Sequence, residues 1–295
     1  LVLIAKSWPD QGSSRLGPPM GPAPPRPVDT AAEPRQKTSM DFPLVFLEGP
    51  WRLAMGLKAL DPDRWLVLDD RFDEELGLRE RFIAERPGEV HACLPEAERG
   101  ADELLALLFR ELPRLHPERY LATAEGLEDR VRGRRFGRDE PPLVTCGRLV
   151  QEDFCLMGRQ PDGAYALWGA ILCFPLHWRL HDKLGRPLAA PAFRGNSGAA
   201  ERPVWRANWG LVEKPDLFQP GRREPVALTP ENAGRKLWLR VERQILRRLP
   251  ASGLVVFGIR TFVRGLAEMT RQPRQAAAMA ARIQEQPEPK AAARK

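Results

Sequence analysis

The stretch LWLRVERQILRRLP, residues 237–250, decides the fold of this chain. Its Leu, Val and Ile residues are typical of a β-strand, yet arginines interrupt the apolar pattern. A turn-like segment, RRLPASG (247–253), leads into a second strand-like run, GLVVFGIRTFV (253–263). This order predicts an antiparallel hairpin, and it raises the question of what the arginines contact.

A second hairpin is predicted upstream of the first. RLVQEDFCLM (148–157) and AYALWGAILCF (164–174) are strand-like runs, and GRQPDG (158–163) between them has the chemistry of a turn. Still earlier, DEELGLRERFIAER (73–86) and ADELLALLFRELPRL (101–115) have apolar residues at helical spacing. Helices followed by antiparallel hairpins predict an α+β fold.

Smaller features complete the predicted architecture. Pro113 and Pro117 are expected to end or kink the second helix. The basic segment RVRGRRFGRDEPP (130–142) is expected to form a loop. The stretches 42–60 and RWLVLDD (64–70) are expected to contribute short strands and turns.

Composition divides the chain into three parts. Residues 1–39 are rich in Pro, Gly and charge and poor in apolar residues, so we expect a disordered tail. Residues 40–272 have the composition of one globular domain, and 273–295 form an Ala-rich tail. No apolar run approaches the roughly 20 residues that span a bilayer, so no membrane partner is expected. Four cysteines without a CxxC pair are typical of a reduced, cytoplasmic protein.

One acidic residue lies on the apolar face of a predicted strand. Because strand residues alternate between two faces, Glu152 shares its face with Val150 and Phe154. A carboxylate there is costly unless it is paired or protonated, and this placement is one sign of a catalytic or binding group. A structural salt bridge with an arginine is the alternative, and both interpretations stay open.

The same alternation predicts which arginines are enclosed. Arg243 interrupts an apolar row, Arg260 does so in the partner strand, and Arg206 lies within PVWRANW (203–209). Enclosed arginine suits bidentate contact with carboxylates.

The remaining arginines of the opening stretch, Arg240, Arg247 and Arg248, are expected in solvent. The net charge of +7 permits acidic partners. A nucleic-acid surface would gather its basic residues on one exposed face. Here the charges are split between faces and Glu242 interrupts them, so no nucleic-acid partner is expected.

Motifs of several common enzyme classes are absent, including GxGxxG, the Walker loop, HExxH and GxSxG. His177 and His181 are four residues apart, a spacing that places both on one face of a helix, where they could ligate a metal. No third ligand is apparent nearby in the sequence, and a solvated pair is the alternative.

Six segments in order resemble the haem-dependent oxidative N-demethylase family: GPWRLAMGLKALDPDRWLVLD, LVQEDFCLM, CFPLHW, KLGRPL, PVWRANW and LWLRVERQILRRLP with VVFGIRTFV. The resemblance covers residues 42–272. It implies a PAS-like α+β domain, with an antiparallel sheet and flanking helices, that holds haem b. It further implies a monooxygenase that demethylates a small amine such as dimethylamine with O2 and with electrons passed from NAD(P)H by a flavin and iron–sulfur reductase.

The resemblance also implies roles for individual residues. Glu152 would lie near the amine or the oxygen-binding side, with catalytic partners Arg179 and Arg206. Cofactor contacts, including those to the haem propionates, would come from Arg243, Asn208 and Arg260. The iron ligand would be His181 or His177.

One departure from the family pattern concerns that ligand. Family members have a His-containing segment, IHxPVP-like, shortly after the equivalent of KLGRPLAA (183–190). Here the chain reads AAPAFRGNSGAAERPVWRANW, and no histidine follows His181. We therefore expect substoichiometric haem. The alternatives are a non-catalytic PAS-like binding or sensing module and a basic protein that binds a polyanion.

Overall fold

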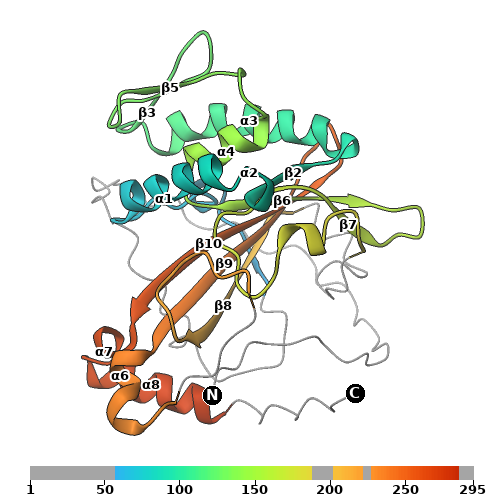
Figure 1. Cartoon of the computed structure of the whole chain (residues 1–295). Coiled ribbons are helices and arrows are strands. Elements are labelled where there is room, and N and C mark those ends of the chain that lie inside the picture. The colour runs from blue at the N-terminus through green and yellow to red at the C-terminus, as the bar shows by residue number, and fades with distance from the viewer. Residues whose placement is uncertain (1–56, 188–201, 222–226, 286–295) are drawn as a thin grey trace, which may run out of the picture.

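The computed structural model describes residues 57–187, 202–221 and 227–285 of the chain (Figure 1). The predicted disordered tail, 1–39, lies outside the described residues, as does the altered segment that begins after Ala190. The described part confirms an α+β fold with a large antiparallel sheet and flanking helices.

The large sheet has seven strands in the described residues, in the order β1-β8-β9-β10-β6-β7-β2, with all neighbours antiparallel. Their bounds are Lys58–Ala59 for β1, His91–Cys93 for β2, Asp153–Arg159 for β6, Tyr165–Ile171 for β7, Val204–Val212 for β8, Trp238–Arg248 for β9 and Val255–Gly265 for β10. A small sheet contains β3 (Tyr120–Ala122), β4 (Leu127–Asp129) and β5 (Arg134–Phe136).

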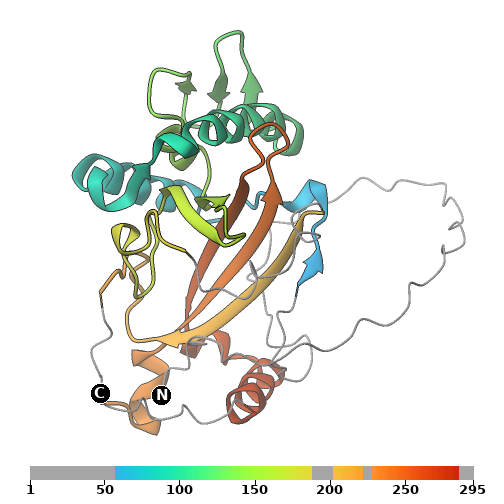
Figure 2. The ribbon, with the colours of Figure 1, turned by 90° about the vertical axis from the view of Figure 1, so that its right-hand side faces the viewer.

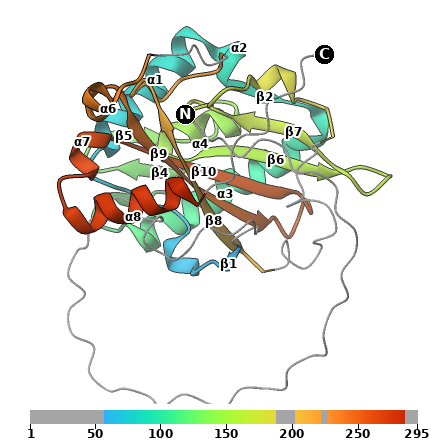
Figure 3. The same cartoon turned by 90° about the horizontal axis from the view of Figure 1, so that it is seen from below.

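The helices gather at the two ends of the long strands β8 to β10 (Figures 1 and 2). At one end lie α1 (Phe72–Glu85), α2 (Pro87–Val90), α3 (Pro95–Leu115) and α4 (Pro142–Leu149). At the other end lie α6 (Pro230–Lys236), α7 (Leu266–Met269) and α8 (Pro273–Gln284). Seen from below, α8 lies across these strands (Figure 3). Two short 3-10 helices, η2 (Pro62–Arg64) and η3 (Leu180–Asp182), complete the described elements.

Both predicted hairpins are confirmed, although the first strand of the upstream one begins at Asp153 and not at Arg148, which belongs to α4. In the β9–β10 hairpin, Ile245 pairs with Gly258, and Gly253 takes the left-handed backbone (φ 75°) that its turn needs. A side chain at position 258 would collide with Ile245, whose Cγ1 would lie 2.7 Å from the added Cβ. Glycine at position 258 therefore leaves the space that the side chain of Ile245 occupies.

Alternation along β9 divides the sheet into two faces. Leu239, Val241 and Ile245 lie on one face and pack in clusters that include residues of the helices at both ends, and we call it the helix face. Arg240, Glu242, Gln244 and Leu246 lie on the other. Arg206 of β8 pairs with Gln244 and lies on this second face, so we call it the Arg206 face.

Two expectations about the elements were wrong. The basic segment 130–142 is not all loop, because β5 and the first residue of α4 fall within it. Residues 64–70 form no strand, although Trp65 and Val67 are fully buried. Helix α3 includes Pro113 and ends at Leu115, two residues before Pro117, which agrees with an end of the helix at these prolines.

Candidate functional site

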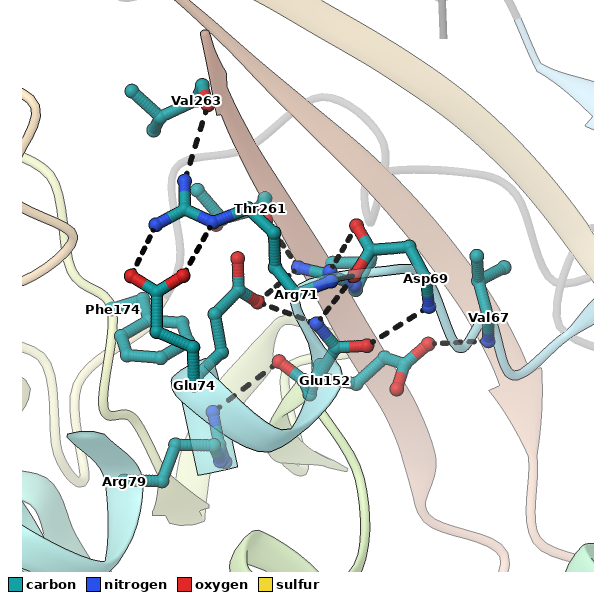
Figure 4. Close-up of polar contacts among 12 residues, drawn as sticks. Val67, Asp69, Arg71, Glu74, Arg79, Glu152, Phe174, Thr261 and Val263 are labelled. Carbon is teal, nitrogen blue, oxygen red and sulfur yellow. Dashed lines mark hydrogen bonds and ion pairs between the residues drawn. The ribbon is translucent and has the colours of Figure 1, made fainter. Parts of the chain in front are cut away.

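Glu152 precedes β6 and lies on the helix face, with 1% of its surface exposed. Its Oε1 accepts a hydrogen bond from the backbone N–H of Val67 at 2.9 Å, and its Oε2 has no partner within the described residues (Figure 4). Burial raises the pKa of this carboxyl, and the charges of Arg260 and Arg243 oppose the shift. Glu152 therefore favours the neutral acid more than an exposed glutamate does.

Arg260 closes a polar network beside Glu152. Its guanidinium forms ion pairs at 2.8 Å with both Asp69 and Glu75. The side-chain amide of Gln151 donates to the same two carboxylates, at 2.9 Å and 2.7 Å (Figure 4). Arg260 is fully buried, as expected, but its charge is used inside the protein.

Arg243 is enclosed, as the alternation predicted, with 6% of its surface exposed. Its guanidinium donates to the carbonyls of Arg64 and Trp65 and lies 5.4 Å from the ring centroid of Trp205. Burial lowers the pKa of Arg243, and the charge of Glu152 opposes this. The described contacts of Arg243 anchor the segment that leads to Val67.

A hydrogen-bonded row of polar side chains lies along the Arg206 face. Arg206 donates through Nε to Gln244 Oε1 at 2.8 Å, and Gln244 donates through Nε2 to Glu242 Oε2 at 3.2 Å. Glu242 also accepts from Nε of Arg240 at 3.2 Å. The terminal nitrogens of Arg206 donate no hydrogen bond within the described residues. A guanidinium only donates hydrogen bonds, so these two nitrogens can bind an anion.

Arg206 is half-buried, and Arg240 is 2% exposed. Burial lowers the pKa of Arg206, and the charge of Glu242 opposes the shift. The expectation that Arg240 lies in solvent was wrong. The i, i+2 spacing of Arg240, Glu242 and Gln244 could have predicted the polar row. It could not have predicted the burial of Arg240, because the residues that cover Arg240 are distant in sequence.

His177 is held tightly in a short segment after β7. Its backbone N–H donates to Gln219 O at 2.7 Å, and its Nδ1 contacts the carbonyl of Gly221 at 3.0 Å. Because a carbonyl can only accept, Nδ1 carries the hydrogen, and Nε2 of the neutral ring keeps its lone pair. Among the described non-glycine residues His177 alone has a positive φ, 59°, which costs roughly 1–2 kcal/mol.

His181 and Arg179 lie nearby on the surface. Nε2 of His181 contacts the carbonyl of Gly88, and Arg179 is exposed. No α-helix spans 177–181, so the two histidines do not form the pair that helical spacing would give. In the described part of the chain, no group of three or more His, Cys, Asp and Glu residues is placed to hold a metal ion.

The predicted site residues separate into two groups on opposite faces of the sheet. Glu152, Arg243 and Arg260 lie on the helix face. Arg206 lies on the other face, with the exposed Asn208 beside it on β8. The segment that contains His177 and Leu180 also lies on the Arg206 face, because Leu180 packs there with Leu246 and Val255. Strand alternation predicts which residues of one strand share a face. Which residues of β8 share a face with those of β9 follows only from the register of the two strands.

The chain matches the family described as haem-dependent oxidative N-demethylase, alpha subunit-like, over residues 56–191 and 196–295. The match is interrupted at 192–195, within the segment where the family resemblance places its histidine. Within the described ranges, no helix is both long and apolar enough to cross a membrane.

Proposed function

The chain belongs to the haem-dependent oxidative N-demethylase alpha-subunit-like family, and we propose that it removes a methyl group from a small secondary amine. Membership implies dependence on haem, a substrate and a redox partner. The proposal adds haem b, O2 as oxidant, and a flavin and iron–sulfur reductase that passes electrons from NAD(P)H. A PAS-like fold and a cytoplasmic location stay predictions.

The Arg206 face fits a haem better than the helix face does. On the helix face, Arg243 and Arg260 use their donors on backbone carbonyls and carboxylates, and the surrounding apolar side chains are fully buried. On the opposite face, Arg206 keeps two donor nitrogens that suit a propionate. This fork of Arg206 is the observation that carries the placement.

His177 is the residue that would hold the haem iron. A ligating histidine normally donates its other ring N–H to a carbonyl or carboxylate, which fixes the tautomer. The contact of His177 Nδ1 with the carbonyl of Gly221 supplies this arrangement and leaves Nε2 for iron. His181, whose Nε2 contacts Gly88, is the second candidate.

When bound, the haem would supply the oxidising chemistry, and the chain would orient the amine and exclude water. For a cationic amine, the Arg206 face offers the carboxylate of Glu242. The sequence pointed instead to Glu152, which lies on the helix face. We propose Glu242 for amine binding, while the roles predicted for Glu152, Asn208 and Arg179 stay predictions.

A haem titration of the full chain tests this placement through the Soret band. We expect Arg206→Leu to weaken haem binding by about tenfold or more, because a charge-assisted hydrogen bond is lost. Arg206→Lys should restore it only in part, because lysine lacks the planar fork. The matched control is Arg243→Leu, an enclosed arginine on the opposite face. Loss of haem in Arg243→Leu but not in Arg206→Leu would place the haem on the helix face.

The ligand is tested in the same titration. His177→Ala should shift the Soret maximum and lower the occupancy, whereas His181→Ala should do neither. The reverse result would assign His181. A fully occupied haem that neither substitution affects would contradict both assignments.

A non-catalytic binding module of the same fold is the second candidate. The observation that favours it is the interruption of the family match at 192–195, where the resemblance expects a histidine. A wild-type chain without a Soret band after haem addition would support this candidate and reject the demethylase. Restoration of haem occupancy by an IHxPVP-type segment inserted after Ala190 would show that the missing segment is the cause.

A further inference from the structure

Two chain segments lie beside Arg240 on the Arg206 face, and the second of them holds His177, the last residue of the first. Residues 175–177 run beside residues 217–221, where Leu176 and Gln219 form a bridge. Gln219 donates its backbone N–H to Pro175 O at 3.0 Å and accepts from the N–H of His177 at 2.7 Å. We call these two segments the clamp, since Gln219 fixes the backbone of His177 and Gly221 fixes its ring.

Arg240 ties both segments of the clamp to the sheet. Its Nη2 donates to Phe174 O at 2.6 Å, and its Nη1 donates to Leu217 O at 3.3 Å. Its Nε donates to Glu242 at 3.2 Å, so the buried cation has a carboxylate partner. One side chain therefore contacts the residue just before the first segment, the first residue of the second segment, and Glu242 of the polar row.

A second buried ion pair, Asp153 with Arg79, contacts Phe174 through its N–H group, whereas Arg240 contacts its carbonyl. Asp153 accepts from the N–H of Phe174 at 2.8 Å and from the N–H of Cys173 at 2.7 Å. Arg79 of α1 pairs with Asp153 at 2.7 Å, and neither side chain is more than 1% exposed. Phe174 is thus bonded through its N–H to Asp153 and through its carbonyl to Arg240.

The left-handed backbone of His177 requires such support. A strained conformation persists only where surrounding contacts determine it, and such residues cluster at functional sites. Without Arg240, the carbonyls of Phe174 and Leu217 would lose their donors, and the clamp could relax to ordinary backbone angles.

We propose that Arg240 is a positioning residue that holds the clamp and thereby keeps His177 Nε2 directed to a ligand. This inference rests on the proposed function only in naming haem iron as that ligand. The orientation of the ring is a property of the haem-free protein and can be measured without haem.

The test compares Arg240→Met and Arg240→Lys with wild type in the haem-free full chain. Long-range ¹H–¹⁵N NMR spectra report the tautomer of His177, and hydrogen exchange reports the amides of His177 and Gln219. The control is Arg248→Met, because Arg248 lies on the same face of β9 but bonds to Gly253 of its own hairpin at 2.9 Å.

In wild type and Arg248→Met we expect the neutral ring of His177 to carry its hydrogen on Nδ1. In Arg240→Met this preference should disappear, and the two amides should exchange roughly tenfold faster or more, since two charge-assisted bonds are lost. Protection of the β10 amides should persist. An unchanged tautomer and unchanged exchange in folded Arg240→Met would overturn the proposal.

Arg240→Lys decides the matter if Arg240→Met does not fold. Lysine keeps the charge but cannot reach the three acceptors together, so partial loss of the tautomer preference is expected. A wild-type result in Arg240→Lys would overturn the proposal in that case.

Haem addition then separates the two ideas. If the Arg240 substitutions change the tautomer of His177 but no Soret band forms in wild type, the positioning role of Arg240 is supported and the demethylase proposal fails. If haem binds through His177 but the ring does not respond to Arg240, only the positioning role fails.

Discussion

The carboxyl of Glu152 is 1% exposed and has one hydrogen-bond donor, Val67, in the described structure. Burial raises its pKa above the ordinary value of 4.5, although Arg260 and Arg243 oppose the shift. By contrast, the exposed Glu74 accepts a hydrogen bond from Arg71, which lowers its pKa. The pKa of the glutamate carboxyl is thus shifted in opposite directions at the two positions.

Glu152→Gln should flatten the loss of stability that accompanies rising pH. In wild type, the unfolded state ionises near pH 4.5 while folded Glu152 stays neutral, so stability falls as pH rises from there through the folded pKa. Glutamine cannot ionise, and each unit of raised pKa corresponds to about 1.4 kcal/mol. Urea unfolding between pH 4 and pH 9 measures the difference, which should grow with pH in favour of the variant.

Glu74→Gln is the control with the opposite sign. Because its folded pKa is lowered, Glu74 contributes stability above its unfolded pKa and loses it as pH falls through the folded value. A parallel response of Glu152→Gln and wild type at every pH would show that Glu152 ionises normally in the folded protein.

At the scale of elements, the β9–β10 hairpin positions most of the candidate residues. Its eleven-residue strands carry Arg243 and Arg260 on one face and Arg240, Glu242 and Gln244 on the other. Gly258 of β10 lets Ile245 and Phe154 pack closely at the centre of the sheet. The hairpin is therefore both a core element and the frame of the polar row.

Gly258→Ala should destabilise the protein by about 1–3 kcal/mol, since the added Cβ would overpack the core. Ile245 would have to move, as its Cγ1 would lie 2.7 Å away. Gly265→Ala, at the end of the same strand, meets no atom within 4 Å and should have little effect. Chemical denaturation of both variants measures the contrast. Equal stability of the two would mean that the hairpin tolerates extra volume at its centre.

At the scale of the whole molecule, three apolar clusters among the described residues hold the sheet and helices together. One cluster joins Val67, Leu239 and Phe262 to Met279 of α8, which is 2% exposed. The predicted domain boundary at residue 272 would separate α8 from this cluster. That boundary stays a prediction, which a truncation can test.

Truncation after Gln272 should lower the free energy of unfolding by roughly 2 kcal/mol or more, because the cluster around Met279 becomes exposed. Met279→Ala should reproduce much of this loss. Truncation after Glu285 retains α8 and is the control. An unchanged urea midpoint after removal of residues 273–295 would show that the domain ends where composition places its boundary.

The sequence by itself determined the α+β class, both long hairpins, the burial of Arg243 and Arg260, and the family resemblance. These depend on local properties: side-chain periodicity, turn residues and the high cost of placing an unpaired charge on an apolar face. Each can be read within one segment, without knowing what lies beside it.

Only the tertiary structure decided which residues of different strands share a face. Arg206 and Arg243 are opposed because Arg206 pairs with Gln244 and Ala207 pairs with Arg243, a register that neither strand encodes alone. Arg240 is buried because Phe174 and Leu217, distant in sequence, supply its acceptors. Strand register and packing between distant segments, added to periodicity, therefore placed the buried residues around Glu152 and the row on the Arg206 face on opposite sides of the sheet.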